Sequence, residues 1–342
     1  MTETSESLGR RASMADVAAR AGVSGQTVSR VVNGSPRVDP ATRARVEAAL
    51  AALGYRPHAA ARALRTGRSQ TIGVIVSTLA SVGNSRMLEA VARAAADRDY
   101  ALTVVTLGAN GREALAGAFD RLRGQGVDGA LVLNEASALA REAEPPRGLH
   151  LVVVDSPADD RFAVVESDHE GGARTAVEHL LALGHETVWH LAGPEASYAA
   201  AARERGWRAA LEGAGVLAPP VVRGDWSSAS ALVVGGSIAD RPDVSAVFAA
   251  NDQMALGMLR ALAEAGRPVP GSGAGGVSVV GFDDVPDAAQ YAPSLTTVRQ
   301  DFDVLGHRAV AALAEGIESG VAPAGVSTVP TELIVRASTA PR

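Results

Sequence analysis

The chain has 342 residues, enough for two or three domains, and 47% of them are hydrophobic, as in a globular protein with a sizeable core. It contains no cysteine, which excludes a disulfide framework and thiol chemistry. No apolar run reaches the roughly 18 residues that a membrane span needs, and the polar start MTETSES is unlike a secretion signal. We therefore expect a cytoplasmic protein without a membrane partner.

The whole-chain net charge of −6 conceals an uneven distribution. Residues 1–68 contain eleven Arg and five Asp or Glu, a net charge of +6. The remaining residues contain 21 Arg and 33 acidic residues, a net charge of −12. A basic segment joined to an acidic remainder is typical of a module that binds the phosphates of nucleic acid.

The stretch 13–34, SMADVAARAGVSGQTVSRVVNG, predicts two short helices joined by a tight turn. Ser13 can cap the first helix, and Asp16 stands at the capping-box spacing from it. Gly22 permits the turn conformation between the helices, and Ser24 can cap the second helix. This pattern is typical of a helix-turn-helix, whose second helix enters the major groove of DNA.

The second helix of this stretch has an apolar face containing Val28 and Val31. Gln26 and Arg30 are four residues apart and share another face. Glutamine pairs well with adenine edges and arginine with guanine edges. The alternative is a helical hairpin whose polar residues merely face solvent. Asp39 followed by proline predicts a third helix, which completes a small core and favours the DNA-binding interpretation.

Two segments, DVAARAGVSGQTVSRVVNG and TRARVEAALAALGYRP, resemble the lactose-repressor family of bacterial transcription regulators. The resemblance implies that Gln26 and Arg30 read bases. Gly25 stands where the matching family motif has tyrosine, so we expect a related DNA site but not an identical one. The other candidate DNA-contacting residues of the head are Ser13, Ser24, Gly25, Thr27, Ser29, Asn33 and Tyr55.

The segment 58–65, HAAARALR, favours a helix but is too short to form one alone in water. The resemblance implies a hinge helix that orders on operator binding, with Leu64 wedging a base step apart in the minor groove. His58 and Ala61 are the other candidate hinge contacts. The alternative is an ordinary interdomain linker whose leucine packs on the following domain.

From residue 70 onward, short apolar strands alternate with helices, which predicts an α/β body of two doubly wound parallel sheets. The expected strands are 71–76, 101–106, 129–133, 150–154, 187–191, 246–249 and 277–281. Helices are expected between them, for example at 85–98, 112–124, 171–183, 199–213 and 252–264. The family resemblance implies a periplasmic-binding-protein-like pair of lobes with the ligand between them. The expected domains are a head at 1–57, a hinge and linker at 58–69 and a body at 70–342, with a first lobe at about 70–166 and 302–328 and a second at about 167–298 and 329–340.

A sugar presents hydroxyls and an apolar ring face, so its site needs polar side chains and an aromatic platform. The resemblance implies polar contacts from Asp155, Arg203, Asn251, Asp283 and Gln300, a platform at Trp226, and further lining by Ser77 and Phe302. Asp155 could instead cap a loop, Arg203 could be solvated, and Trp226 could belong to the core.

At two places in the sequence, two adjacent polar residues are both candidates for contact with the ligand. We expect only one of Asp283 and Asp284 to face the ligand. We also expect Asp252 to cap the helix that begins there, which leaves Asn251 for the ligand. A galactoside or another small glycoside is the preferred ligand, although Ser81 and its neighbours make the rim more polar than in the family.

Two short patterns do not predict a cofactor or metal. The GSGAGG at 271–276 contains G-x-G-x-x-G, but it precedes a strand instead of a helix. His185, Glu186 and His190 lack the H-E-x-x-H spacing of a zinc site. No G-x-S-x-G elbow is present either, so we expect no cofactor, no metal and no enzymatic activity.

These features favour a sequence-specific repressor that binds a pseudo-palindromic operator in double-stranded DNA as a homodimer. A small sugar effector in the body would control operator affinity. The end at Arg342, without a leucine heptad, predicts dimers and not tetramers. One alternative is a sugar-binding transport component, and another is an enzyme on a doubly wound fold; neither explains the basic head.

Overall fold

The structure, a computed structural model, describes residues 12–55, 67–108, 111–142, 148–270, 276–322 and 324–342. It divides into two compact units, Met1–Ser69 and Gln70–Arg342, which we call the head unit and the body. The expected hinge residues His58, Ala61 and Leu64 lie outside the described residues.

The described part of the head unit is a three-helix bundle of α1 (Met14–Ala21), α2 (Gly25–Val32) and α3 (Pro40–Ala52). Its core takes one fully buried valine from each helix, Val17, Val28 and Val46. The expected capping box at the start of α1 is confirmed, and Ser24 caps α2 by accepting a hydrogen bond from the Thr27 N–H at 3.1 Å. Gly22 adopts a φ of 65°, a conformation that costs other residues more.

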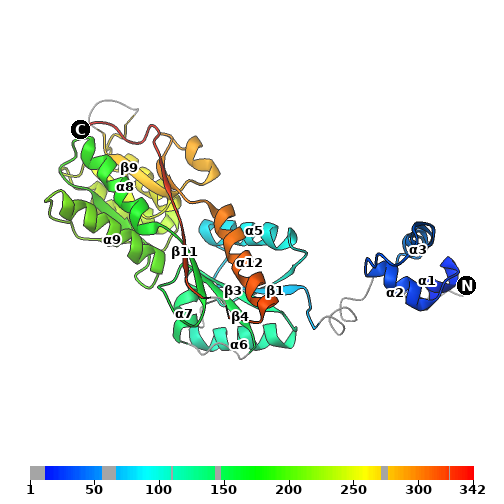
Figure 1. Cartoon of the computed structure of the whole chain (residues 1–342). Coiled ribbons are helices and arrows are strands. Elements are labelled where there is room, and N and C mark those ends of the chain that lie inside the picture. Colours follow the sequence, from blue (N-terminus) through cyan, green and yellow to red (C-terminus); the bar gives the residue numbers. More distant parts are fainter. Residues whose placement is uncertain (1–11, 56–66, 109–110, 143–147, 271–275, 323) are drawn as a thin grey trace, which may run out of the picture. The chain divides into compact units, whose positions relative to one another are not determined.

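The first lobe of the body is a parallel six-stranded sheet with helices on both faces (Figure 1). The strand order is β11-β5-β4-β3-β1-β2, and side chains alternate between the faces, so that Val74 packs with one helix layer and Ile75 with the other. The strands are β1 (Thr71–Val76), β2 (Ala101–Thr106), β3 (Gly129–Leu133), β4 (His150–Val154), β5 (Ala163–Ser167) and β11 (Val326–Val329). Helices α5 (Val82–Ala96) and α12 (Phe302–Ser319) cover one face, and α6 (Gly111–Gly124) and α7 (Ala136–Glu142) cover the other.

The second lobe repeats this three-layer arrangement, with the strand order β12-β10-β9-β8-β6-β7. Its strands are β6 (Trp189–Ala192), β7 (Val222–Arg223), β8 (Ala246–Ala249), β9 (Ser278–Asp283), β10 (Thr296–Arg299) and β12 (Glu332–Ile334). Helices α8 (His169–Ala182) and α9 (Tyr198–Gly213) cover one face, and α10 (Ser228–Ala239) and α11 (Asp252–Glu264) cover the other. A short 3-10 helix, η1 (Pro286–Gln290), follows β9.

The α/β fold of two doubly wound lobes is confirmed, and all seven expected strands form within two residues of their expected bounds. One edge of the second sheet departs from the parallel arrangement, because β12 pairs antiparallel to β10. Helix α10 contains two adjacent glycines, which disfavour a helix. Packing of α10 on α11 stabilises it instead.

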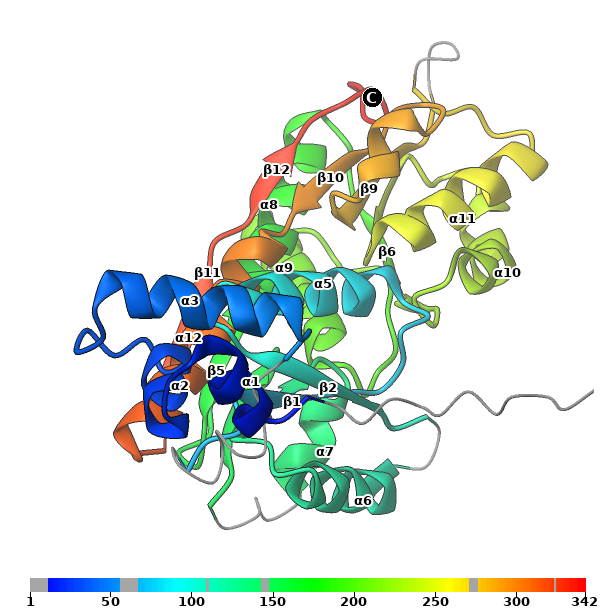
Figure 2. The same ribbon diagram turned by 90° about the vertical axis from the view of Figure 1, so that its right-hand side faces the viewer.

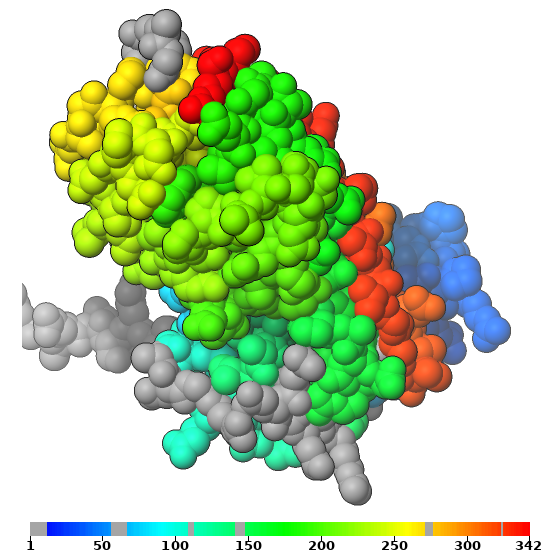
Figure 3. All heavy atoms as spheres, turned by 90° about the vertical axis from the view of Figure 1, so that its left-hand side faces the viewer, coloured from blue at the N-terminus to red at the C-terminus, as the bar shows by residue number. Residues whose placement is uncertain are grey.

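The chain passes between the two sheets after β5, after β10 and after β11 in the described part of the body. Figure 2 shows the last of these connections, in red, rising from β11 to β12. Figure 3 shows the two lobes in contact, with the cyan surface of the first below the green and yellow surface of the second. Among the described residues, no helix has the length and apolar character to cross a membrane.

His190 on β6 is a fully buried polar residue in the second lobe. Its ring stacks on Phe248 with a centroid distance of 4.9 Å, and its Nδ1 donates to the Phe248 carbonyl at 3.0 Å. Burial disfavours the charged imidazolium and lowers the pKa of His190 from 6.5 to about 4.

This pKa predicts a loss of stability in weak acid. Above pH 6.5 the ring is neutral in both states, but between pH 6.5 and 4 the unfolded chain binds a proton that the folded chain excludes. At about 1.4 kcal/mol per pH unit, we expect the free energy of unfolding to fall by about 2–3 kcal/mol between pH 7.5 and 4.5 through this residue. Denaturant unfolding of the wild type and of His190→Asn at both pH values measures the difference, and equal losses would contradict the prediction.

Candidate nucleic-acid interface and ligand site

The exposed face of α2 is the candidate surface for reading DNA. Gln26 and Arg30 are exposed, whereas Val28 and Val31 are buried in the bundle. Within the described residues neither polar side chain has a recorded hydrogen-bond partner, so both are available for an external ligand. The first turn of α2 at Gly25 is open, because no atom lies within 4 Å of the position that a Cβ would occupy.

The other expected head contacts have structural roles in the bundle. The Ser13 hydroxyl donates to the Asp16 carboxylate at 2.7 Å, and the hydroxyls of Ser24 and Thr27 are 2.9 Å apart. The Asn33 amide donates to the Ser29 carbonyl at 2.6 Å. Tyr55 packs partly buried against the core. The structure thus leaves Gln26 and Arg30 more available than these residues.

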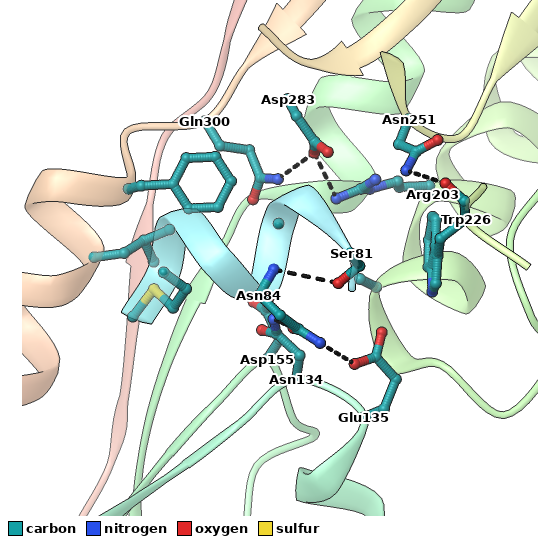
Figure 4. Close-up of a pocket in the computed structure, with 15 residues that line it drawn as sticks. Ser81, Asn84, Asn134, Glu135, Asp155, Arg203, Trp226, Asn251, Asp283 and Gln300 are labelled. Carbon is teal, nitrogen blue, oxygen red and sulfur yellow. Dashed lines mark hydrogen bonds and ion pairs between the residues drawn. The ribbon is translucent and has the colours of Figure 1, made fainter. Parts of the chain in front are cut away.

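A polar cavity lies where the carboxyl ends of strands from both lobes meet (Figure 4). Asp155 follows β4 in the first lobe, whereas Asp283 ends β9 and Gln300 follows β10 in the second. The crevice beyond the carboxyl ends of parallel strands is the usual ligand site of doubly wound sheets. This topology brings together residues that are more than a hundred positions apart in the sequence.

The cavity contains seven of the eight expected ligand residues. Its lining comprises Ser81, Gly83, Asn84, Met87, Asn134, Glu135, Asp155, Ala199, Arg203, Trp226, Asn251, Asp283, Gln300, Phe302 and Leu305. Ser77 is absent from this lining, and its carbonyl accepts a hydrogen bond from the Gly108 N–H at 3.1 Å. The cavity volume is about 50 Å³, room for a few water molecules, so entry of a sugar would require side chains or lobes to move.

Arg203 on α9 is 4% exposed, so it is not a solvated helix arginine. Its guanidinium donates to the Ala250 carbonyl and lies 3.4 Å from the Asp283 carboxylate. It also lies over the Phe282 ring, 3.8 Å from the centroid. Burial lowers the pKa of Arg203, and the negative charge of Asp283 opposes that shift.

Asp283 faces the cavity and Asp284 does not, as expected. The Asp283 carboxylate accepts a hydrogen bond from the Gln300 amide at 2.6 Å. Burial raises the pKa of Asp283 above its ordinary value, and the positive charge of Arg203 offsets only part of that shift. Asp284 pairs instead with Arg299 and Arg336, each at 2.7 Å.

The expectation that Asp252 caps α11 was wrong and requires correction. Asn251 caps α11, because its Oδ1 accepts a hydrogen bond from the Met254 N–H at 2.8 Å. Its amide Nδ2 also donates to the Trp226 carbonyl at 3.1 Å while Asn251 lines the cavity. Asp252 is buried and accepts hydrogen bonds from the Thr297 hydroxyl and, at 2.8 Å, from the Val285 N–H.

The wall contributed by the first lobe contains the expected polar rim residue Asn84 together with Asn134 and Glu135, which the sequence predictions missed. Asn84, 1% exposed, donates from Nδ2 to the Glu135 carboxylate at 3.2 Å and to the Thr78 carbonyl at 2.9 Å. The Asn134 amide donates to Asn84 Oδ1. Asn134 and Glu135 directly follow β3, so the strand-end position was the available signal for finding them.

Four residues of the cavity hold a backbone conformation that L-amino acids rarely adopt. Positive φ angles occur at Asn134 (49°), Asp155 (55°), Trp226 (76°) and Asp283 (109°). Such conformations cost on the order of 1–3 kcal/mol each and cluster at functional sites. The Asp155 carboxylate is further held 2.9 Å from His169 Nε2. The conformation of the cavity walls is therefore determined by tertiary structure and not by local preference.

Comparison with known proteins agrees with this arrangement of a helical head and a two-lobed body. Residues 13–58 match the family "Bacterial regulatory proteins, lacI family", and residues 177–339 match the "Periplasmic binding protein-like domain". The lactose operon repressor of Escherichia coli K12 is 38% identical over 95% of this chain and 89% of its own length.

Two solved structures are similar over nearly the whole chain. A lac repressor dimer bound to operator and the anti-inducer ONPF has a TM-score of 0.86 at 36% identity, covering 97% of this chain and all of that one. A complex of the transcriptional regulator CelR with cellobiose has a TM-score of 0.72 at 33% identity, covering 96% of this chain and all of that one.

A helix-turn-helix head joined to a periplasmic-binding-protein-like body defines a class of bacterial regulators. The chain belongs to the lacI family of bacterial regulatory proteins. Its relatives are named as transcriptional regulators and not as enzymes.

Gly193 provides the space that the Trp226 indole occupies. A Cβ at residue 193 would lie 2.5–2.7 Å from the outer edge of that ring. We expect Gly193→Ala to reduce the free energy of unfolding by about 1–3 kcal/mol through overpacking. Trp226→Phe should recover part of this loss in the double variant, because the shorter ring lacks the colliding edge. Denaturant unfolding provides the measurement.

Gly213, at the end of α9, is the matched control. No atom lies within 4 Å of an added Cβ there, so Gly213→Ala should not reduce stability. Strictly additive effects of Gly193→Ala and Trp226→Phe would show that the two residues do not compete for space.

Proposed function

We propose that the chain is a DNA-binding transcriptional repressor whose operator affinity is controlled by a small sugar bound between the lobes. The observation that carries this proposal is a buried polar cavity, lined from both lobes, in a chain whose head exposes Gln26 and Arg30. The named functions of relatives of nearly full length support it.

In this proposal residues 1–57 are the DNA-binding head, residues 58–69 the hinge and linker, and residues 70–342 the effector-binding and dimerisation body. A homodimer would place two heads on the half-sites of a pseudo-palindromic operator, as a lac repressor dimer binds operator in its crystal structure. Because the chromosome is the site of action, we place the protein in the bacterial cytoplasm.

The sugar would bind with its hydroxyls against Asp155, Asn251, Asp283 and Gln300 and its ring face against Trp226. The cavity of about 50 Å³ leaves little room for this ligand until side chains or lobes move. In this proposal the sugar has different affinities for two arrangements of the lobes, which is the condition for controlling a second site. A galactoside or another small glycoside fits this chemistry, and a relative bound to cellobiose supports a glycoside ligand.

The alternative of a sugar-binding transport component does not account for the head. The similarity to regulators extends over head and body together, as it does for the repressor that is 38% identical. The proposed role is regulatory and requires no catalytic step.

The experiment that tests the proposal uses the full-length protein. A random duplex library should yield a pseudo-palindromic site, and sugars that raise the thermal unfolding temperature should change affinity for that site. Failure to select any DNA sequence, or sugar binding without any effect on DNA affinity, would refute the proposal.

The exposed Arg30 of α2 leads to a prediction about how the head recognises DNA bases. Arg30→Ala should weaken binding to the selected site by about 1–3 kcal/mol and relax the preference at one base position in each half-site. Arg45→Ala on α3, also exposed, is the control and should leave the base preference unchanged. Gel-shift titration against single-base operator variants measures both effects. An unchanged base preference in Arg30→Ala would exclude base reading by this residue.

The carboxylate between Arg203 and Gln300 generates a prediction on effector binding. Asp283→Asn keeps the side-chain volume but removes the charge that compensates Arg203. We expect sugar affinity to fall by about 1.5–3 kcal/mol, the range for a hydrogen bond to a charged group, while operator binding without sugar is retained. Calorimetry and gel shift measure the two affinities, with the exposed Asp243→Asn as control. Unchanged sugar affinity would remove Asp283 from the site.

A further inference from the structure

The charged side chains that line the cavity are not balanced. Three carboxylates, Glu135, Asp155 and Asp283, stand against one guanidinium, that of Arg203. Arg203 is paired with Asp283, and Asp155 lies 2.9 Å from His169. Within the described residues Glu135 has no recorded ion-pair partner at close range, and the Arg203 guanidinium, whose pKa its charge helps to raise, is already paired with Asp283.

The Glu135 carboxylate is held in place by a buried amide. Asn84 donates to it at 3.2 Å, and that amide is itself fixed by its bond to the Thr78 carbonyl and by contact with Asn134. An amide can orient a carboxylate without neutralising it. In Figure 4 the carboxylate extends from the first-lobe wall on the side opposite Asp283.

A ligand that fills the cavity must replace the water around this carboxylate. A carboxylate accepts hydrogen bonds and donates none, and a desolvated carboxylate without a donor is costly. A hydroxyl or an ammonium group on the ligand would supply the donor, whereas an anionic group would add repulsion.

We propose that Glu135 is a specificity-determining residue: it selects sugars that carry a donor, hydroxyl or ammonium, toward the first lobe and excludes anionic sugars. The ligand class is thus neutral or amino sugars, and not sugar phosphates or sugar acids. This inference rests on the proposed function, since it concerns the same cavity.

The test measures binding to the full-length protein by calorimetry with four sets of probes. The neutral set contains galactose, glucose, lactose and cellobiose, and the anionic set contains the 6-phosphates and uronic acids of the two monosaccharides. The amino set contains galactosamine and glucosamine. Each set is measured with the wild type, with Glu135→Gln and with the control Glu212→Gln, an exposed residue of α9; operator DNA is the fourth probe.

We expect the wild type to bind neutral or amino sugars and to bind the corresponding anionic sugars at least tenfold more weakly. Glu135→Gln should weaken the best neutral ligand about five- to tenfold, as expected when a neutral hydrogen bond replaces a charge-assisted one, and should improve anionic binding relative to neutral binding. An amino sugar that loses more than its neutral parent in Glu135→Gln identifies ammonium as the donor. Equal losses identify a hydroxyl, and either result supports the proposal.

The inference is overturned if wild type binds anionic sugars as well as neutral ones, or if Glu135→Gln behaves as Glu212→Gln does. The proposed function would survive that result, provided that a neutral sugar binds and alters operator affinity. If no probe binds and operator affinity never changes, both the inference and the sugar-controlled function fail.

Discussion

The buried guanidinium of Arg203 constrains the arrangement of the second lobe around the cavity. A charge removed from water must be paired and hydrogen-bonded, since an uncompensated one costs several kcal/mol. The compensating groups are the carbonyl of Ala250 after β8, the Phe282 ring and the carboxylate of Asp283 at the end of β9. That carboxylate also fixes Gln300, where the chain leaves the second sheet. The pairing of this one buried cation thus sets the relative positions of the carboxyl ends of β8, β9 and β10.

The other wall of the cavity comes from a lobe that is joined to this one by three chain connections. A ligand that contacts both walls therefore acts on the separation of two compact cores, each already packed on both faces of its sheet. Because packed cores deform little, the accessible response is a rigid-body change between lobes.

The head and most body elements could be predicted because their signals are local. Caps, a proline at a helix start and alternating apolar strands identified the three head helices and seven strands. The structure places the residues after β4, β9 and β10 at the cavity, but local signals failed between Asn251 and Asp252. Both residue types can cap a helix, and only their hydrogen-bond partners in the fold distinguish them. Glu135 was missed because its importance depends on β3 lying beside β1, which brings Asn84 within reach.

The two walls of the cavity differ in how much a substitution would cost the fold, and Asn251 shows the difference. The same side chain caps α11 and holds the Trp226 carbonyl, so its replacement would damage folding before it altered ligand preference. Asn84 is buried and its amide is bonded to Thr78, Asn134 and Glu135, so its replacement would also cost stability. Glu135 is only half-buried and accepts one recorded hydrogen bond, so a substitution there would alter the cavity wall at a lower cost in folding than a substitution of Asn251.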